Sequence, residues 1–217
     1  MVLGRRDSTS ASVDTANTDI PSPAFDVKRL VSTFQNQGLS PRDMVALSGT
    51  YYTHGPHESI NTKPMGILSC GTIIINNIGM YIYCTGAHTI GQARCVVFRN
   101  RIYNENTTMD GRYASVVQGR GPTSGGDNNL SPLDFGSATR FDNCYFTNVE
   151  EKRGLLHSDQ QLFSSGDSSI ASIVLSYAAN PATFFNDFQR AMINMGNIKP
   201  LTGTNGQIRT NCRIVNS

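Results

Sequence analysis

The sequence predicts a mainly α-helical domain with long ordered loops and one irregular or strand-like insertion. Apolar residues recur at helical spacing in several stretches, and residues that start or stop helices flank those stretches. Loops rich in Gly, Ser and Asn separate them, notably at 119–129 and 201–206. One segment, residues 50–86, differs in composition from everything around it.

The first predicted helix ends before Gly38, a natural C-terminal stop. The apolar residues of its inner face, spaced i, i+3, i+4 and i+7, are Val27, Leu30, Val31 and Phe34. A second helix is predicted to start at Ser40, with Pro41 in the first helical position and Asp43 three residues after the cap. The apolar run 44–47 continues it.

Two further apolar stripes predict helices in the C-terminal third of the chain. The first consists of Ile170, Ile173, Val174 and Tyr177. The second, preceded by Pro181, consists of Phe184, Phe188, Met192 and Met195. Both stripes are interpreted as packing surfaces.

The bulk composition excludes some classes of function. A net charge of +2 is too small a bias to indicate nucleic-acid binding. No run of about 18 apolar residues suggests a membrane span, and residues 1–14 lack the pattern of a signal peptide. We therefore expect no nucleic-acid or membrane partner. We also expect the protein to be a monomer.

The cysteines are odd in number and form no C-x-x-C pair, so they fit no zinc pattern. They are Cys70, Cys84, Cys95, Cys144 and Cys212. Because five cysteines cannot all pair internally, the count implies a free thiol, an external partner or a missing piece.

Residues 50–86 carry only two charges, Glu58 and Lys63, and seven isoleucines. The stretches 72–75 and 80–83 have the composition of β-strands. We interpret 50–86 as a foreign insertion between residues 1–49 and 87–217, which would form one domain.

With the insertion set aside, the chain reads SPRDMVALSG followed by AHTIGQARC, which resembles the proximal-haem signature of the plant secretory (class III) peroxidases. Further blocks match that family in order: LGRRDS, SGGDNNLSPLD, RFDNCYF, RGLLHSDQQLF, FFNDFQRAMINMG and LTGTNGQIRTNCRIVNS. The resemblance covers essentially all of the chain outside 50–86. It implies the proximal half of the haem-peroxidase fold and a family that oxidises phenolic donors with hydrogen peroxide.

The resemblance also implies a haem b site. His88 corresponds to the axial ligand of the iron, and Asp159 to the carboxylate that accepts a hydrogen bond from it. Such a hydrogen bond raises the basicity of the ligand. His54, His57 and His157 are given no functional role.

A calcium ion is implied beside this site, held by oxygen ligands as calcium prefers. The matching positions are Thr89, Asp134, Ser137 and Asp142, completed by a backbone carbonyl near Arg140. The family usually has Thr where this chain has Ser137, which keeps the hydroxyl. Pro21 matches a proline at the edge of the site for the aromatic donor.

The chain departs from the family in three ways. The family's distal half, with its catalytic His and Arg, has no counterpart in residues 1–49. Cys95 would pair with a cysteine where this chain has Gly121, and Cys212 with one in the distal half. The third departure is the insertion, whose boundaries at Gly49-Thr50 and Thr85-Gly86 can be encoded with GT and AG, as in a retained intron or a faulty gene model.

We therefore expect the family's enzyme activity to be impaired in these 217 residues alone. The alternative is a non-catalytic remnant that binds haem or calcium, or a product that misfolds. The family implies secretion or a vacuolar location, and hydrogen peroxide and small phenolic donors as partners.

Overall fold

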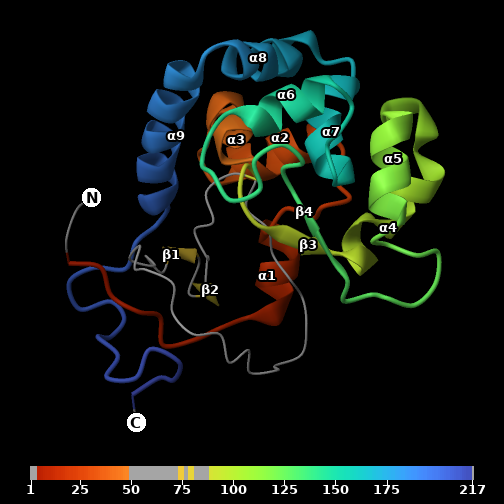
Figure 1. The fold of residues 1–217 in the computed structure, drawn as a ribbon. Helices are drawn as coiled ribbons and strands as arrows, with labels where there is room; N and C mark the ends of the chain where they lie inside the picture. The colour runs from red at the N-terminus through yellow and green to blue at the C-terminus, as the bar shows by residue number, and fades with distance from the viewer. Residues whose placement is uncertain (1–3, 49–72, 76–77, 81–87, 217) are drawn as a thin grey trace.

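The computed structural model describes residues 4–48, 73–75, 78–80 and 88–216, and they form the predicted mainly helical domain (Figure 1). The helices are α1 (Val13–Asp19), α2 (Val27–Asn36), α3 (Pro41–Leu47), α4 (Cys95–Asn104), the 3₁₀ turn η1 (Asn106–Thr108), α5 (Gly111–Gln118), α6 (Cys144–Glu150), α7 (His157–Ser164), α8 (Ser168–Ala179) and α9 (Pro181–Gly196). The strands are β1 (Ile73–Ile75), β2 (Ile78–Met80), β3 (Gln92–Arg94) and β4 (Leu130–Pro132).

The helix boundaries follow the local signals in the sequence. Gly38, just after α2, has a positive φ of 79°, which glycine adopts without strain. Helix α3 begins with a complete capping box, in which the Ser40 side chain accepts from the Asp43 N–H and the Asp43 side chain accepts from the Ser40 N–H. Pro181 is the first residue of α9, capped by the side chain of Asn180. The predictions for these helices are confirmed.

Six helices, α2, α3, α6, α7, α8 and α9, share the larger hydrophobic core (Figure 1). Its fully buried members include Met44 and Leu47 of α3, Phe146 of α6 and Phe184 of α9. All four predicted apolar stripes contribute to this core or pack against it. Burial of each large side chain contributes about 1.5–3 kcal/mol, so this core dominates the stability of the domain.

A second, smaller core lies around α4 and α5, on the right of Figure 1. It includes Phe98 and Ile102 of α4, Tyr113 of α5, and the pair Leu155 and Leu156 that leads into α7. Because α7 itself contributes Leu162 to the larger core, its N-terminus lies where the two cores meet. That junction carries the candidate site.

The short sheet β3–β4 was not predicted from the sequence. The strands are antiparallel and pair Ala93 with Ser131, so the segment after His88 lies beside the segment before Asp134. Each strand is three residues long, too short for periodicity to reveal it. The pairing joins residues far apart in the chain, which only tertiary structure can specify.

The proposed insertion contains β1 and β2, an antiparallel pair in which Ile74 is opposite Gly79. Strand β1 falls within the predicted strand-like stretch 72–75, and β2 includes only Met80 of the stretch 80–83. The boundaries at Gly49-Thr50 and Thr85-Gly86 lie outside the described residues, as do His54, His57, Cys70 and Cys84.

The two ends of the described chain lie together. Asp7 forms an antiparallel bridge with Gln207, and the Arg209 guanidinium donates to the Ser8 carbonyl at 2.7 Å.

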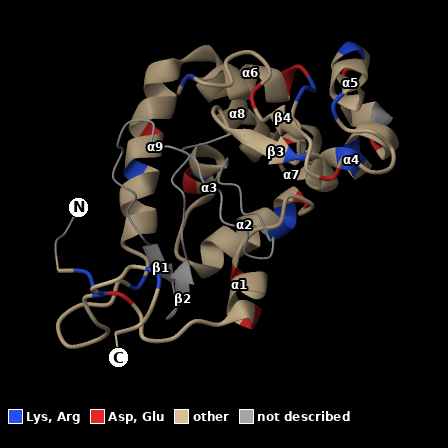
Figure 2. Cartoon of the chain, turned by 60° about the horizontal axis from the view of Figure 1, so that its bottom comes forward, with Lys and Arg blue, Asp and Glu red and all other residues tan. Residues whose placement is uncertain are grey.

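Basic and acidic residues are interspersed along the helices, in keeping with the small net charge (Figure 2). Among the described helices, none has the length and apolar character needed to cross a membrane.

Candidate functional site

The centre of the site is a buried histidine–carboxylate pair. Nδ1 of His88, just before β3, lies 2.7 Å from Oδ1 of Asp159 on α7. His88 is 4% exposed and Asp159 is 2% exposed. The two residues are 71 positions apart in the chain, so the pair exists only because the segment before β3 folds back to the start of α7.

The pair fixes the tautomer of His88. A carboxylate only accepts hydrogen bonds, so Nδ1 carries the proton and donates to Asp159. Nε2 then presents a lone pair, and it is buried with no hydrogen-bond partner among the described residues. A buried polar atom without a partner is costly unless something else satisfies it. An imidazole oriented by a carboxylate, with its other nitrogen open, is the usual arrangement of a metal ligand.

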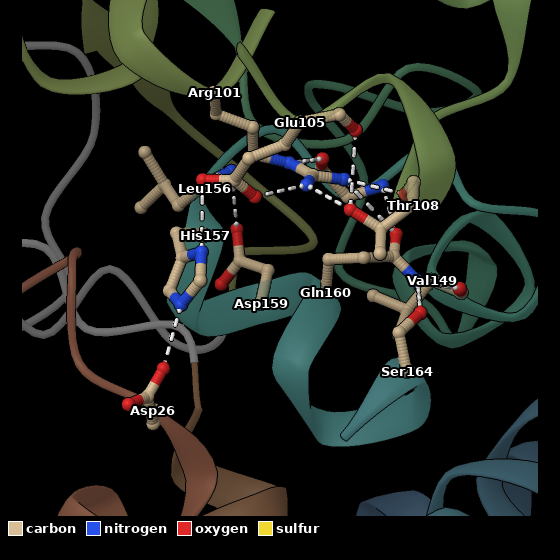
Figure 3. Close-up of polar contacts among 11 residues, drawn as sticks. Asp26, Arg101, Glu105, Thr108, Val149, Leu156, His157, Asp159, Gln160 and Ser164 are labelled. Atoms are coloured by element: carbon tan, nitrogen blue, oxygen red, sulfur yellow. Dashed lines mark hydrogen bonds and ion pairs between the residues drawn. The ribbon is translucent and has the colours of Figure 1, made fainter. Parts of the chain in front are cut away.

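Asp159 is held by its position in α7. It is the third residue of the helix, and its Oδ2 accepts from the Leu156 N–H at 3.2 Å (Figure 3). The Tyr145 hydroxyl of α6 donates to Oδ1 at 3.1 Å. The carboxylate thus accepts three hydrogen bonds, from His88, Tyr145 and Leu156, which compensate for its burial.

A second polar network fixes the start of α7 from the side of the smaller core (Figure 3). Arg101 of α4 is 2% exposed, and its Nε donates to the Gly154 carbonyl at 2.9 Å. The Gly154 N–H donates to Oε1 of Gln160, the residue after Asp159, at 3.2 Å. Arg101 also pairs with Glu105 at 2.8 Å, so its buried charge is compensated.

His157, the first residue of α7, connects three helices (Figure 3). Its Nδ1 lies 2.9 Å from Glu105 at the end of α4, and its Nε2 lies 3.0 Å from Asp26 at the start of α2. Both partners only accept, so both ring nitrogens must donate and the imidazole is a cation. Partial burial by itself lowers the pKa of His157, but the hydrogen bonds to Asp26 and Glu105 outweigh it, and the pKa is raised.

Beside His88 the structure gathers oxygen atoms from the positions predicted for calcium. The Thr89 hydroxyl lies 2.8 Å from the Asp142 carbonyl and 3.3 Å from the Arg140 carbonyl. The Ser137 hydroxyl lies 2.8 Å from Oδ1 of Asp142 and 3.3 Å from Oδ2 of Asp134. All four predicted side chains and the Arg140 carbonyl therefore lie close together.

The two carboxylates of this oxygen cluster are in different electrostatic environments. Burial, and then the charge of Asp142, raise the pKa of Asp134, which is fully buried and has no ion pair with a described Lys or Arg. Burial also acts to raise the pKa of Asp142, but hydrogen bonds from Cys144 and Ser137 lower it overall. Two carboxylates compensated mainly by neutral donors are typical of a site that a hard cation can occupy.

The other residues singled out from the sequence are placed as follows. Pro21 is half-buried in the loop between α1 and α2, and this loop is tied to α7 because the Pro23 carbonyl accepts from the Ser158 N–H at 3.0 Å. Cys95 is buried as a free thiol facing Gly121.

The sequence offers no reason to assign a role to Tyr145, because a tyrosine among apolar helix residues is most simply interpreted as a packing residue. Its role depends on the hydrogen bond from its hydroxyl to Asp159, which only the folded structure shows.

Comparisons with known proteins identify relatives. The family model described as Peroxidase matches residues 1–180. The chain is similar to Peroxidase RIP1 of Medicago truncatula, with 43% identity over 99% of the chain and 54% of that protein. It is similar to Peroxidase 4 of Vitis vinifera, with 45% identity over 99% of the chain and 55% of that protein. It is also similar to Peroxidase 22.3 of Oryza sativa subsp. japonica, with 43% identity over 100% of the chain and 56% of that protein. The chain spans about half the length of the curated relatives it matches.

Proposed function

The chain belongs to the peroxidase family, as a relative of the plant secretory (class III) enzymes, and from this we propose that its residues form the haem-proximal part of an enzyme that oxidises aromatic donors with hydrogen peroxide. The observation that carries the proposal is the His88–Asp159 pair at 2.7 Å. It supplies an imidazole with an oriented, unsatisfied Nε2 in a buried setting.

The residues fit a haem b group. Nε2 of His88 would bind the iron, while the Asp159 carboxylate would hold the proton on Nδ1 and increase the donor strength of the ring. When bound, haem supplies the redox chemistry by which a peroxide is reduced and phenolic donors are oxidised. The protein side chains described here keep His88 in one tautomer and one orientation, and they exclude water from behind it.

We propose calcium as the occupant of the neighbouring oxygen cluster. The ligands would be the side chains of Thr89, Asp134, Ser137 and Asp142, with the Arg140 carbonyl. All are oxygen donors, which hard cations such as calcium prefer. Since Thr89 follows His88 directly, the ion would fix the backbone that carries the axial ligand. For Pro21 we propose a place at the edge of the donor site, supported only by the family resemblance.

The distal His and Arg implied by the family have no counterpart in these 217 residues. A general acid–base group typically contributes a factor of about 10² or more, and so does electrostatic stabilisation of a departing oxygen. We therefore propose that a polypeptide of these residues alone binds haem but turns over peroxide poorly.

Haem reconstitution tests the proposal. Adding haemin to the purified chain should give the Soret band of a protein-bound haem, distinct from that of free haemin, and His88→Ala should remove this band while His157→Gln keeps it. Guaiacol oxidation should be slow. A Soret band without any turnover would favour the alternative of a non-catalytic remnant. A wild-type chain that gives neither a cooperative unfolding transition nor a Soret band would refute the proposal in favour of misfolding.

We also propose that residues 50–86 are an insertion foreign to the peroxidase domain formed by 1–49 and 87–217. The support is compositional, together with the codons that would place GT and AG at its ends. Sequencing the mature transcript decides the origin, because a message that keeps these codons would refute a retained intron.

The location and assembly of the protein are inferred from the family. Relatives of the class III type lead us to propose an extracellular or vacuolar protein that acts as a monomer on small phenolic donors. Cell fractionation would test the location, by showing whether the expressed chain is exported. Light scattering of the purified protein would test whether it is a monomer.

A further inference from the structure

The hydroxyl of Tyr145 shares an acceptor atom with the axial-ligand candidate. Its Oη lies 3.1 Å from Oδ1 of Asp159, and Nδ1 of His88 lies 2.7 Å from the same oxygen. The third donor, the Leu156 N–H, uses the other oxygen, Oδ2. Two donors on one carboxylate oxygen compete for its charge, so each hydrogen bond depends on the other.

The direction of the tyrosine bond follows from the chemistry of its acceptor. Tyr145 is 1% exposed, and its hydroxyl lies 3.1 Å from Oδ1 of Asp159. The phenol donates this hydrogen bond, because a carboxylate can only accept. A strong donor at this oxygen draws charge away from the bond to His88.

The ring of Tyr145 also contacts His88. The two ring centroids are 6.0 Å apart with an interplanar angle of 79°, an edge-to-face arrangement. The Tyr145 ring also packs edge-to-face with Phe146, at a centroid distance of 5.0 Å, inside the larger core. The imidazole is thus positioned by a rigid aromatic neighbour that is itself fixed in the core.

We propose that Tyr145 is a positioning residue that sets the donor strength of His88 through Asp159. This inference rests on the proposed function, because donor strength matters only where Nε2 binds iron. With the hydroxyl in place, Asp159 is a weaker acceptor, and His88 keeps more neutral-imidazole character. Without it, the His88–Asp159 bond strengthens and the ring moves toward imidazolate.

The chain offers a matched control. Tyr113 is another buried tyrosine, 2% exposed, whose hydroxyl has no hydrogen-bond partner among the described residues. Tyr145→Phe and Tyr113→Phe remove the same atom from the same kind of environment. Only the first removes a donor from Asp159, so a general effect of repacking would appear in both variants.

The first measurement needs no haem. Proton and nitrogen NMR of the purified full chain with ¹⁵N-labelled histidine reports the His88 Nδ1–H resonance and the tautomer. Tyr145→Phe should move that resonance downfield, as expected for a shorter hydrogen bond, while Tyr113→Phe leaves it in place. An unmoved resonance in a folded Tyr145→Phe chain would overturn the proposal.

The second measurement uses the chain reconstituted with haemin. Tyr145→Phe should raise the iron–histidine stretching frequency in the resonance Raman spectrum of the ferrous form and make the reduction potential more negative, with no change in Tyr113→Phe. If wild type takes up haem and both variants match it in these readouts, the inference about Tyr145 fails while the proposed function stands. If wild type takes up no haem, the proposed function fails, and the NMR result alone decides whether Tyr145 controls His88.

A third measurement covers the case in which Tyr145→Phe does not fold. The NMR comparison is then made on the chain with 3-fluorotyrosine in place of tyrosine. The more acidic phenol should shift the His88 resonance upfield, and no shift would count against the proposal.

Discussion

Gly121 faces the thiol of Cys95 at the distance of a disulfide partner. A β-carbon placed on Gly121 would lie 3.0 Å from Sγ of Cys95. In a disulfide, the β-carbon of one cysteine lies about 3 Å from the sulfur of the other, as the bond lengths require. Cys95 is buried and free, so the backbone of the chain retains the geometry of a bridge that its sequence cannot form.

Gly121→Cys is therefore expected to form a disulfide with Cys95 and to stabilise the domain by about 3 kcal/mol. The added β-carbon also comes within 2.8 Å of Phe98 Cε2 and 3.2 Å of Ile102 Cδ1, so these side chains must shift slightly. Gly121→Ser introduces the same crowding without the bond and should be destabilising. Thermal unfolding with and without reductant separates the two effects, and a Gly121→Cys chain insensitive to reductant would contradict the prediction.

Asp159→Asn is expected to weaken haemin binding by about 10- to 100-fold, the usual effect of losing a partner of a metal-ligating histidine. The amide can donate toward Nδ1 and so favour the wrong tautomer of His88. The measurement is a haemin titration followed by the Soret band. Ser158→Ala, one residue earlier in α7, serves as the control, and equal affinity of Asp159→Asn and wild type would count against the assignment.

Calcium is expected to stabilise the chain through the oxygen cluster. At about 100 times the dissociation constant, a ligand that binds only the folded state adds about 2.7 kcal/mol to the free energy of unfolding. Asp142→Asn should abolish the rise in melting temperature that calcium produces, and a chelator should lower the melting temperature of wild type but not that of Asp142→Asn. Asp127→Asn, which changes an exposed carboxylate paired with Arg99, should respond to calcium as wild type does.

His157 is expected to give the stability a pH dependence. Its pKa is raised in the folded state, so its stabilisation is complete below the unfolded pKa of about 6.5 and is lost as the pH rises through the folded pKa. His157→Gln should lower the free energy of unfolding by about 0.5–1 kcal/mol at pH 5.5, a small loss because the pair with Asp26 is partly exposed. The loss should be smaller at pH 9, where His157 has lost its charge. Urea unfolding at the two pH values checks this.

Lys152→Gln is the control for that experiment, because the Lys152 ammonium contacts the Thr107 carbonyl at 3.4 Å and not the carboxylates that hold His157. A loss of stability in His157→Gln that is the same at pH 5.5 and pH 9 would show that the side chain acts by packing alone.

Local signals in the sequence specify the individual helices. Ser40, Pro41 and Asp43 specify the start of α3, and the apolar spacing in α2, α8 and α9 specifies which face of each helix is buried. These signals act over three or four residues, so they can be read without knowing the fold. The resemblance to the class III peroxidases added the expectation that Asp159 accepts a hydrogen bond from His88.

The contacts between distant segments, in contrast, depend on the folded arrangement of the whole domain. The pairing of β3 with β4, the buried guanidinium of Arg101 and the tyrosine hydroxyl on Asp159 all join residues that are far apart in the chain or that no local pattern marks. Their physical basis is the packing of two cores around the start of α7, which removes water and makes a buried polar group without a partner costly. The sequence supplied the donors and acceptors, and the packing of the cores selected which of them bond.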